Sequence, residues 1–203
     1  MASELLLTPL QELKVLQHQI PAHGLLIPNT SLQRKPLLIY KAAFHTPPPP
    51  PQNPTTTTTT TTTSSSIASA IETHLSRIGI VVPQWRFTMY STSHFHSTTH
   101  EVLAVCHGRA RLCFGHEENP GRVESVLERG DVIVIPAGVS HRLLEDLDGG
   151  FEMVGSYPEG SGCRRWDMCY GRPGEEGQIA GIRGLGWFER DPVYGDEGPV
   201  LGV

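Results

Sequence analysis

The chain has 203 residues, of which 38% are apolar, enough for one buried core and about one domain. Its 16 Lys and Arg against 21 Asp and Glu give a net charge of −5, and the basic residues are scattered, which argues against a nucleic-acid partner. The four cysteines form no CxxC pair, which excludes a zinc ribbon or a thioredoxin-like motif, so we expect free thiols in a reducing compartment.

Targeting signals are not evident in the sequence. The N-terminal apolar run lacks a basic region and a small-residue cleavage site. No apolar run approaches the roughly 20 residues that a membrane span requires. We therefore expect a cytoplasmic protein without a membrane partner.

The chain is expected to divide into three parts. Residues 1–44 form an N-terminal extension that packs on the main domain; within it, residues 36–44 are β-rich, while residues 10–19 fit either a helix or a strand. Residues 45–66 are a Pro/Thr/Ser-rich insertion, expected to be disordered, since a glycosylated stalk would require secretion. Residues 67–203 form the main domain.

A surface helix is expected directly after the insertion. Ser66 can cap its start and Gly79 can end it. The apolar residues recur at helical spacing, at Ile67, Ile71, Leu75 and Ile78.

From residue 85 to residue 158 the pattern changes to short β-rich runs separated by turns. This spacing predicts an antiparallel all-β sandwich or barrel. The tail that follows is rich in Gly and Pro, and we expect Trp166, Trp187 and Phe188 to anchor it on the barrel.

Four histidines and a glutamate lie within the segment HFHSTTHEVLAVCHG, residues 94–108. A zincin helix would need HExxH, but the position of its second histidine is Ala104. On a strand, His94 and His96 share a face, because residues two apart point to the same side. A turn would let Glu101 return to that face and add an oxygen ligand. These three residues leave a metal site incomplete, so a fourth ligand must come from elsewhere in the chain.

The sequence resembles the cupin family at two motifs. HFHSTTHEVLAVCHG fits the first cupin motif, HxH-x4-E-x6-G, and GDVIVIPAGVSH, residues 130–141, fits the second, which ends at His141. Two positions depart from the usual motifs, with Thr88 for a glycine and Glu145 for an asparagine. GSYPEG and DPVYG, at residues 155–160 and 191–195, resemble phrases of the small YjlB-type cupins of unassigned function.

This resemblance implies an all-β fold, the double-stranded β-helix or jelly-roll barrel of cupins, with one or two short helices and the N-terminal extension. It also implies that His94, His96, Glu101 and His141 hold one divalent transition metal: Fe, Mn, Ni, Co, Cu or Zn. Three imidazoles and one carboxylate suit any of these ions and leave coordination positions open for substrate, water or dioxygen.

Four further residues are candidates for the site. If strand alternation continues past His141, Glu145 faces the metal as a general acid or base, although a surface position in its acidic run is the alternative. Tyr90 and Arg86 share the parity of His94 and are candidates to bind substrate at the barrel mouth, with ordinary packing as the alternative. His100 is a candidate to contact the substrate or to support a metal ligand, with a solvated turn residue as the alternative.

The leading hypothesis is a metal-dependent enzyme acting on a small organic molecule by oxygenase, isomerase or lyase chemistry. The alternative is a non-catalytic module that binds a small molecule, and a storage-like role is a weaker third option. The cupin resemblance also implies a homodimer.

Overall fold

The computed structural model describes residues 5–45, 58–160 and 166–203, with the backbone alone for residues 58–66. The expectations for residues 46–57 and for Cys163 fall outside these ranges. Cys106, Cys113 and Cys169 are buried free thiols. No helix in the described ranges has the length and apolarity to cross a membrane.

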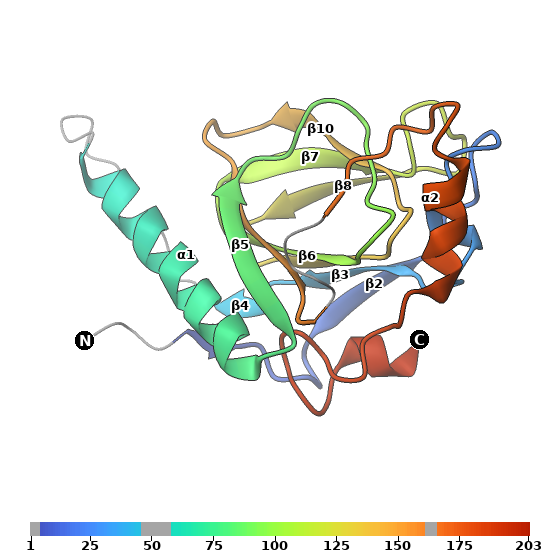
Figure 1. Ribbon diagram of the computed structural model, residues 1–203. Coiled ribbons are helices and arrows are strands. Elements are labelled where there is room, and N and C mark those ends of the chain that lie inside the picture. Colours follow the sequence, from blue (N-terminus) through green and yellow to red (C-terminus); the bar gives the residue numbers. More distant parts are fainter. Residues whose placement is uncertain (1–4, 46–57, 161–165) are drawn as a thin grey trace.

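Two antiparallel sheets face each other and form the barrel (Figure 1). The larger sheet has the order β2-β3-β9-β6-β11-β5: Lys14–His18, Leu37–Lys41, Val132–Ile135, Glu101–His107, Glu152–Pro158 and Val81–Phe87. The smaller sheet has the order β10-β7-β8: His141–Asp146, Arg109–Phe114 and Val123–Glu128. Two short strands pair apart from these sheets, β1 (Leu6–Leu7) and β4 (Phe44–His45).

The larger sheet is buried on both faces, because α1 and the C-terminal tail cover the side that turns away from the barrel. Alternate residues of β6 show this: Val102 and Ala104 belong to the core under α1, whereas Leu103 and Val105 belong to the core between the sheets. Central strands buried on both faces are continuous apolar runs without polar alternation. The runs VIVI in β9 and VLAVC in β6 have this composition.

The helix α1 (Thr58–Ile78) is longer than the sequence predicts. Its end agrees, since Gly79 follows it with a φ of +72°. Its start does not, because residues 58–66 are helical rather than part of a disordered insertion. Extending a helix costs far less than nucleating one, and Ile67, Ile71 and Leu75 already hold the later turns in the core.

The N-terminal segment is part of the sheet, which corrects its expected role as an extension packed on the barrel. β3 lies between β2 and β9, with Leu38 opposite Val134 and Ile39 opposite Ile133. The ambiguous residues 10–19 contain the strand β2, which pairs with β3. The N-terminal segment is extended because β3 pairs with β9, which lies far away in the sequence. A local sequence pattern cannot predict such a distant partner.

The described part of the C-terminal tail contains short helical segments: α2 (Glu176–Gly181) and the 3-10 segments Ile182–Gly184 and Pro199–Gly202. A further 3-10 segment, Asn29–Ser31, lies near the N-terminus. Phe188 and Trp187 pack on the core under α1, as predicted. Asp191 is fully buried there and accepts a hydrogen bond of 2.8 Å from the Tyr40 hydroxyl. Trp166 does not join this core and instead lines a cavity of the barrel.

Candidate metal centre

The two segments with the cupin motifs lie side by side at one end of the barrel. His94 and His141 pair as an isolated antiparallel bridge, with N–O distances of 3.2 and 2.8 Å between their backbones. The Gly138 N–H donates to the carbonyl of His96 at 2.8 Å. Phe95, between the two histidines, pairs with Cys169 and is buried on the opposite side. The predicted parity is confirmed, although the segment forms bridges rather than a continuous strand.

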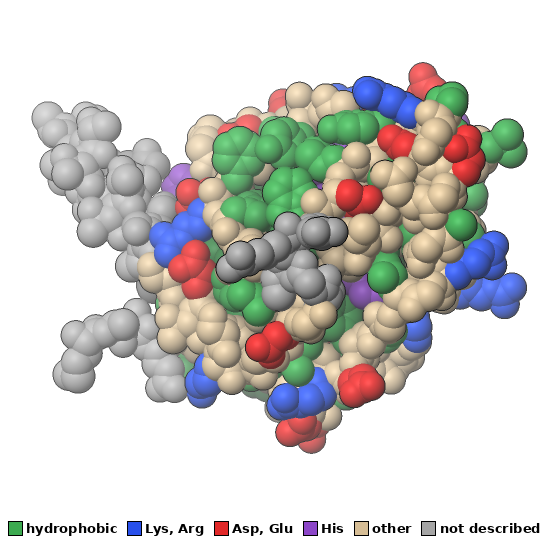
Figure 2. All heavy atoms as spheres, in the orientation of Figure 1, with side chains coloured by type: hydrophobic (Ala, Val, Ile, Leu, Met, Phe, Trp, Pro, Cys, Tyr) green, Lys and Arg blue, Asp and Glu red, His purple; other side chains and the backbone are tan. Residues whose placement is uncertain are grey.

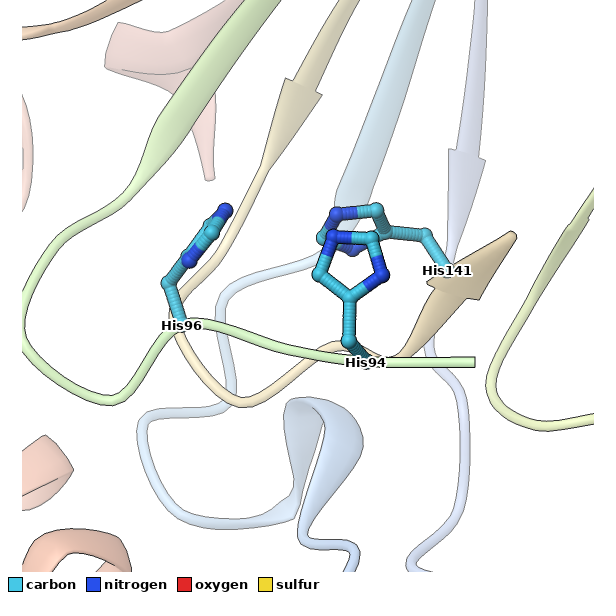
Figure 3. A group of neighbouring side chains, drawn as sticks. All are labelled: His94, His96 and His141. Carbon is cyan, nitrogen blue, oxygen red and sulfur yellow. The ribbon is translucent and has the colours of Figure 1, made fainter. Parts of the chain in front are cut away.

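His94, His96 and His141 converge on one point, as Figure 3 shows. One ring nitrogen from each lies within 4.8 Å of those of the other two. All three side chains are buried, at 4%, 4% and 2% exposure. The three histidines therefore form a group that could hold one metal ion.

Backbone carbonyls orient the three rings. Nδ1 of His94 lies 3.0 Å from the Thr92 carbonyl, Nδ1 of His141 lies 2.9 Å from the Val139 carbonyl, and Nδ1 of His96 contacts the Asp167 carbonyl. A carbonyl only accepts hydrogen bonds, so each Nδ1 is the donor. In the neutral rings the lone pair is then on Nε2, which is the arrangement of metal-ligating histidines.

Glu101, the first residue of β6, reaches two of the three rings. Its carboxylate oxygens lie 3.4 Å from Nε2 of His96 and 3.3 Å from Nε2 of His141. The Tyr157 hydroxyl donates to the same carboxylate at 2.8 Å and accepts from Nε1 of Trp85 at 3.1 Å. Glu101 is therefore fixed from the side of β11 and β5 as well as by the histidines.

The electrostatics of the cluster favour an ionised Glu101 carboxylate and neutral rings at His94 and His141. Burial lowers the pKa of His141 to about 3 and also lowers the pKa of His94. Burial raises the pKa of Glu101, but His96, His141 and the Tyr157 hydroxyl outweigh it and hold the pKa at about 2. Burial also lowers the pKa of His96, but the Glu101 carboxylate outweighs this effect and raises the pKa above its ordinary value.

A divalent transition metal fits this donor set. A fully buried carboxylate with inward-facing imidazole lone pairs concentrates electron pairs at one point, where a cation offsets the cost of burial. Imidazole nitrogen and carboxylate oxygen are ligands that iron, manganese, cobalt, nickel, copper and zinc accept. The carbonyl partners of the rings supply the outer support that such sites require.

The cluster lies in a cavity of about 230 Å³. Tyr90 and Arg86, the predicted mouth residues, both line it. The guanidinium of Arg86, however, is held by Glu72 of α1 through two contacts of 2.6 Å. The described lining residues are Trp85, Arg86, Phe87, Thr88, Met89, Tyr90, His94, His96, Glu101, Leu103, His141, Met153, Tyr157, Trp166 and Met168.

Glu145 does not face the histidines, so the prediction from strand alternation is wrong. The pairing of β10 with β7 shifts between Leu143 and Glu145: these two residues lie opposite Leu112 and Arg111, which are adjacent. Such a bulge reverses the face of every later residue. The Glu145 side chain is 55% exposed and lies 3.2 Å from the Arg111 guanidinium.

His100 does not reach the cavity either, which contradicts its prediction as a substrate contact. Its Nδ1 accepts a hydrogen bond of 3.0 Å from the Ala137 N–H, and its Nε2 lies 3.0 Å from the Gly186 carbonyl. Burial lowers the pKa of His100 to about 4, so the ring is neutral at pH 7. It joins the second motif to the C-terminal tail and is neither a ligand nor a solvated residue.

Sequence reasoning missed Tyr157 and Trp85. Tyr157 lies in the GSYPEG phrase, which points to the family but not to a contact with Glu101. Trp85 packs against Gly155, where a Cβ would lie 2.0 Å from the indole ring. A glycine in the middle of a strand is a signal of such a close approach.

Comparisons with known proteins agree with this fold. The chain is 33% identical over 120 residues to the uncharacterized protein YjlB of Bacillus subtilis, a match that covers 59% of this chain and 68% of YjlB. The family profile described as Cupin matches residues 52–144. The chain belongs to the cupin family. Its antiparallel sheets form the jelly-roll barrel expected of that family.

Three of the solved structures that match parts of this chain do so with low TM-scores. Procruciferin, an 11S globulin from Brassica napus, is 18% identical over 38% of this cupin and 19% of its own chain, with a TM-score of 0.30. RmlC from Streptococcus suis, solved with dTDP-D-xylose, is 11% identical over 70% and 71%, with a TM-score of 0.31. YcfD, a ribosomal oxygenase from Escherichia coli, is 14% identical over 76% and 40%, with a TM-score of 0.29.

Proposed function

We propose that this cupin is a metal-dependent enzyme that acts on a small organic metabolite. One divalent transition metal is held by His94, His96 and His141, with Glu101 as the fourth ligand. The observation that carries the proposal is the orientation of the three rings, whose Nδ1 atoms are all directed to backbone carbonyls. Each Nε2 is thereby directed inward, where it would bind a cation beside the Glu101 carboxylate.

The position of the cluster supports a catalytic use. A metal in a sealed core serves structure alone, whereas this cluster lines a cavity together with Tyr90 and Trp166, which are 50% and 40% exposed. Three histidines and one carboxylate leave coordination positions free. A bound ion would supply Lewis acidity or redox chemistry, which oxygenase, isomerase and lyase reactions use in different ways.

The chain's own residues would bind, orient and shield the substrate. Tyr157 holds the Glu101 carboxylate through a 2.8 Å hydrogen bond, and Trp85 in turn orients the Tyr157 hydroxyl at 3.1 Å. Tyr90, one of the predicted substrate contacts, packs its ring against His94 at a centroid distance of 5.7 Å. A substrate beside His94 would therefore contact Tyr90.

A non-catalytic module that binds a small molecule is the second candidate. Besides the four proposed ligands, the ionisable side chains among the described lining residues are Arg86, Tyr90 and Tyr157. Arg86 is occupied by Glu72, and burial together with Glu101 raises the pKa of Tyr157 far above neutrality. Few groups are thus left to transfer a proton, which favours binding without turnover if the metal itself does not react.

Metal content tests the proposal. The purified full chain is expected to hold one equivalent of transition metal by elemental analysis. His96→Ala should lower the affinity for Co(II) by at least about 100-fold, since it removes one ligand and its support. Circular dichroism confirms that the variant is folded.

A second histidine group provides a matched control. His23, His116 and Glu118 also place ligand atoms within 4.8 Å of one another, but they are more exposed and lie outside the cavity. His116→Ala should leave the tightly bound metal in place. Full metal content in His96→Ala, or loss of the tightly bound metal in His116→Ala, contradicts the proposal. Metal-loaded unsubstituted protein that turns over no class of metabolite favours the binding module.

The proposed setting is the cytoplasm, where the buried thiols of Cys106, Cys113 and Cys169 would stay reduced. A homodimer is proposed from family membership, with a small-molecule substrate as the other partner and neither nucleic acid nor membrane involved. Mass measurement in solution tests the dimer, and a monomeric mass at micromolar concentration would remove it.

A further inference from the structure

We infer that the substrate is an uncharged molecule with one aromatic ring that carries hydroxyl or carbonyl oxygens. The inference deepens the proposed function and rests on it, because those oxygens would face the metal. It is drawn from the walls, charge, mouth and size of the cavity.

Aromatic rings and thioethers make up most of the wall. Three of the four methionines in the sequence line the cavity, at positions 89, 153 and 168. Thioethers are polarisable and contact ring edges favourably, and aromatic rings contribute beyond their buried area when they meet another ring. The aromatic lining residues outside the histidines are Trp85, Phe87, Tyr90, Tyr157 and Trp166.

These rings are placed on both sides of the histidine cluster. On one side, Phe87 lies 5.6 Å from Tyr90, which meets His94 edge to face. On the other side, Trp166 lies 5.8 Å from His96 and is nearly parallel to Tyr157, with 12° between the planes and 6.2 Å between the centroids. A planar substrate that reaches the histidines would pass between two aromatic pairs.

The charge of the wall disfavours an acidic substrate. Arg86 is the one Lys or Arg among the described lining residues, and both oxygens of Glu72 hold its guanidinium at 2.6 Å. A carboxylate or phosphate that points away from the metal would lose its water without gaining a free cation from these described residues.

The described residues at the mouth of the cavity are apolar rings. Phe87 and Tyr90 are each 50% exposed, and Trp166 is 40% exposed. Figure 2 shows apolar side chains gathered on the face beyond the end of β5. Exposed rings grouped at a cavity mark a surface where apolar contact is gained on binding.

The size of the cavity favours a single ring. An apolar cavity of about 150 Å³ accepts benzene. The cavity here, about 230 Å³, has room for such a ring with a few substituents.

A matched pair of catechols tests the inference on the zinc-loaded full chain, under nitrogen so that the probes stay reduced. 4-Methylcatechol and 3,4-dihydroxybenzoate share the ring and both oxygens and differ by a methyl group in place of a carboxylate; oxalate is the non-aromatic chelator. Calorimetry and tryptophan fluorescence measure the affinities. We expect 4-methylcatechol to bind about tenfold tighter than 3,4-dihydroxybenzoate, whereas oxalate measures the affinity of the zinc for an anion without a ring.

Two substitutions at Trp166 separate ring contact from bulk. Trp166→Leu should weaken 4-methylcatechol binding by about 3- to 10-fold, the range of one aromatic contact. Trp166→Phe should restore most of that affinity, and neither variant should change oxalate binding. Trp166 is 40% exposed, so both variants are expected to fold.

Arg86→Gln tests the opposite interpretation, in which the arginine binds an acidic group. If 3,4-dihydroxybenzoate binds as tightly as 4-methylcatechol or tighter, or if Trp166→Leu leaves the preference unchanged, the inference is overturned; a loss of benzoate binding in Arg86→Gln would then assign an acidic substrate. Zinc content is measured in the same samples. Protein without zinc contradicts the proposed function, whereas zinc-loaded protein that prefers the anion contradicts this inference alone.

Discussion

Neighbouring residues of β6 point to opposite faces of the six-stranded sheet, and these two faces border different kinds of core. Leu103 faces the barrel and lines the cavity, whereas Val102 and Ala104 face α1 and the C-terminal tail in a sealed core. Both cores consist of the same residue types, largely Val, Ile, Leu and Phe. The polar groups differ: the sealed core contains the Tyr40–Asp191 pair, and the barrel contains the histidine cluster.

The comparison shows that a buried carboxylate is not enough to make a candidate metal site. The carboxylate must also lie beside a cavity, with partners that can bind a cation. Asp191 is as buried as Glu101, but its oxygens accept hydrogen bonds from Tyr40 and from the backbone of Val193 and Tyr194. Glu101 instead contacts the imidazole nitrogens of His96 and His141 and lines the cavity with them. The first arrangement stabilises a loop, and the second is suited to a cation.

Equal truncations on the two faces should have unequal costs. Leu75 is fully buried under the sealed face, whereas Leu103 borders an existing cavity. We expect Leu75→Ala to lower the free energy of unfolding by about 4 kcal/mol and Leu103→Ala by about 2 kcal/mol, because the new space in the sealed core cannot be filled by solvent. Urea unfolding measures both, and equal losses would show that the two faces are equally closed.

Removing one tyrosine hydroxyl from each face separates metal support from packing. Tyr157→Phe removes the hydrogen bond to Glu101 and should lower metal affinity by about tenfold. Tyr194→Phe removes a bond of 2.9 Å to the Thr8 carbonyl outside the barrel and should cost about 1 kcal/mol of stability without changing metal affinity. Competition with a coloured chelator measures the affinities, and a similar change in both variants would contradict the division.

A histidine in the sealed core, His74, should also make the stability of the fold depend on pH. Burial lowers the pKa of His74 below its ordinary value of 6.5, and its Nε2 donates to the Val193 carbonyl at 2.8 Å while Nδ1 faces Arg77. The unfolded chain then binds more protons than the folded one below pH 6.5, so this contribution to stability is complete above pH 6.5 and decreases as the pH falls.

His74→Gln keeps a donor and should flatten that decrease. The melting temperature is compared with that of the unsubstituted chain between pH 7.5 and 5, in a chelator so that metal release adds nothing. Parallel pH profiles for the two proteins would show that another group is responsible.

The smallest effect is expected at Glu145. Glu145→Gln removes an exposed ion pair with Arg111 and should change stability by less than about 1 kcal/mol. Metal affinity and any turnover should be unchanged, because Glu145 faces away from the cavity. A loss of activity with normal metal content would restore Glu145 as a participant in the reaction.

Local patterns predicted most strands and the end of α1, because alternation and turn residues act over a few positions. They failed where one residue or one distant partner changes the outcome. The bulge before Glu145 reverses a face, and the pairing of β3 with β9 makes the N-terminal segment part of the sheet. His100 was misplaced because its partner, Gly186, lies 86 residues further along the chain.

The sequence by itself determined the family and which residues meet in the cluster, namely the three histidines and Glu101. The spacing of the two motifs constrains which side chains return to the same point. Only the tertiary structure decided that Tyr157 supports Glu101, that Arg86 is held by Glu72 and that aromatic rings surround the cluster. Each of these contacts joins separate elements, and their geometry follows from how the two sheets and α1 pack together. Short-range preferences contain no information about that packing.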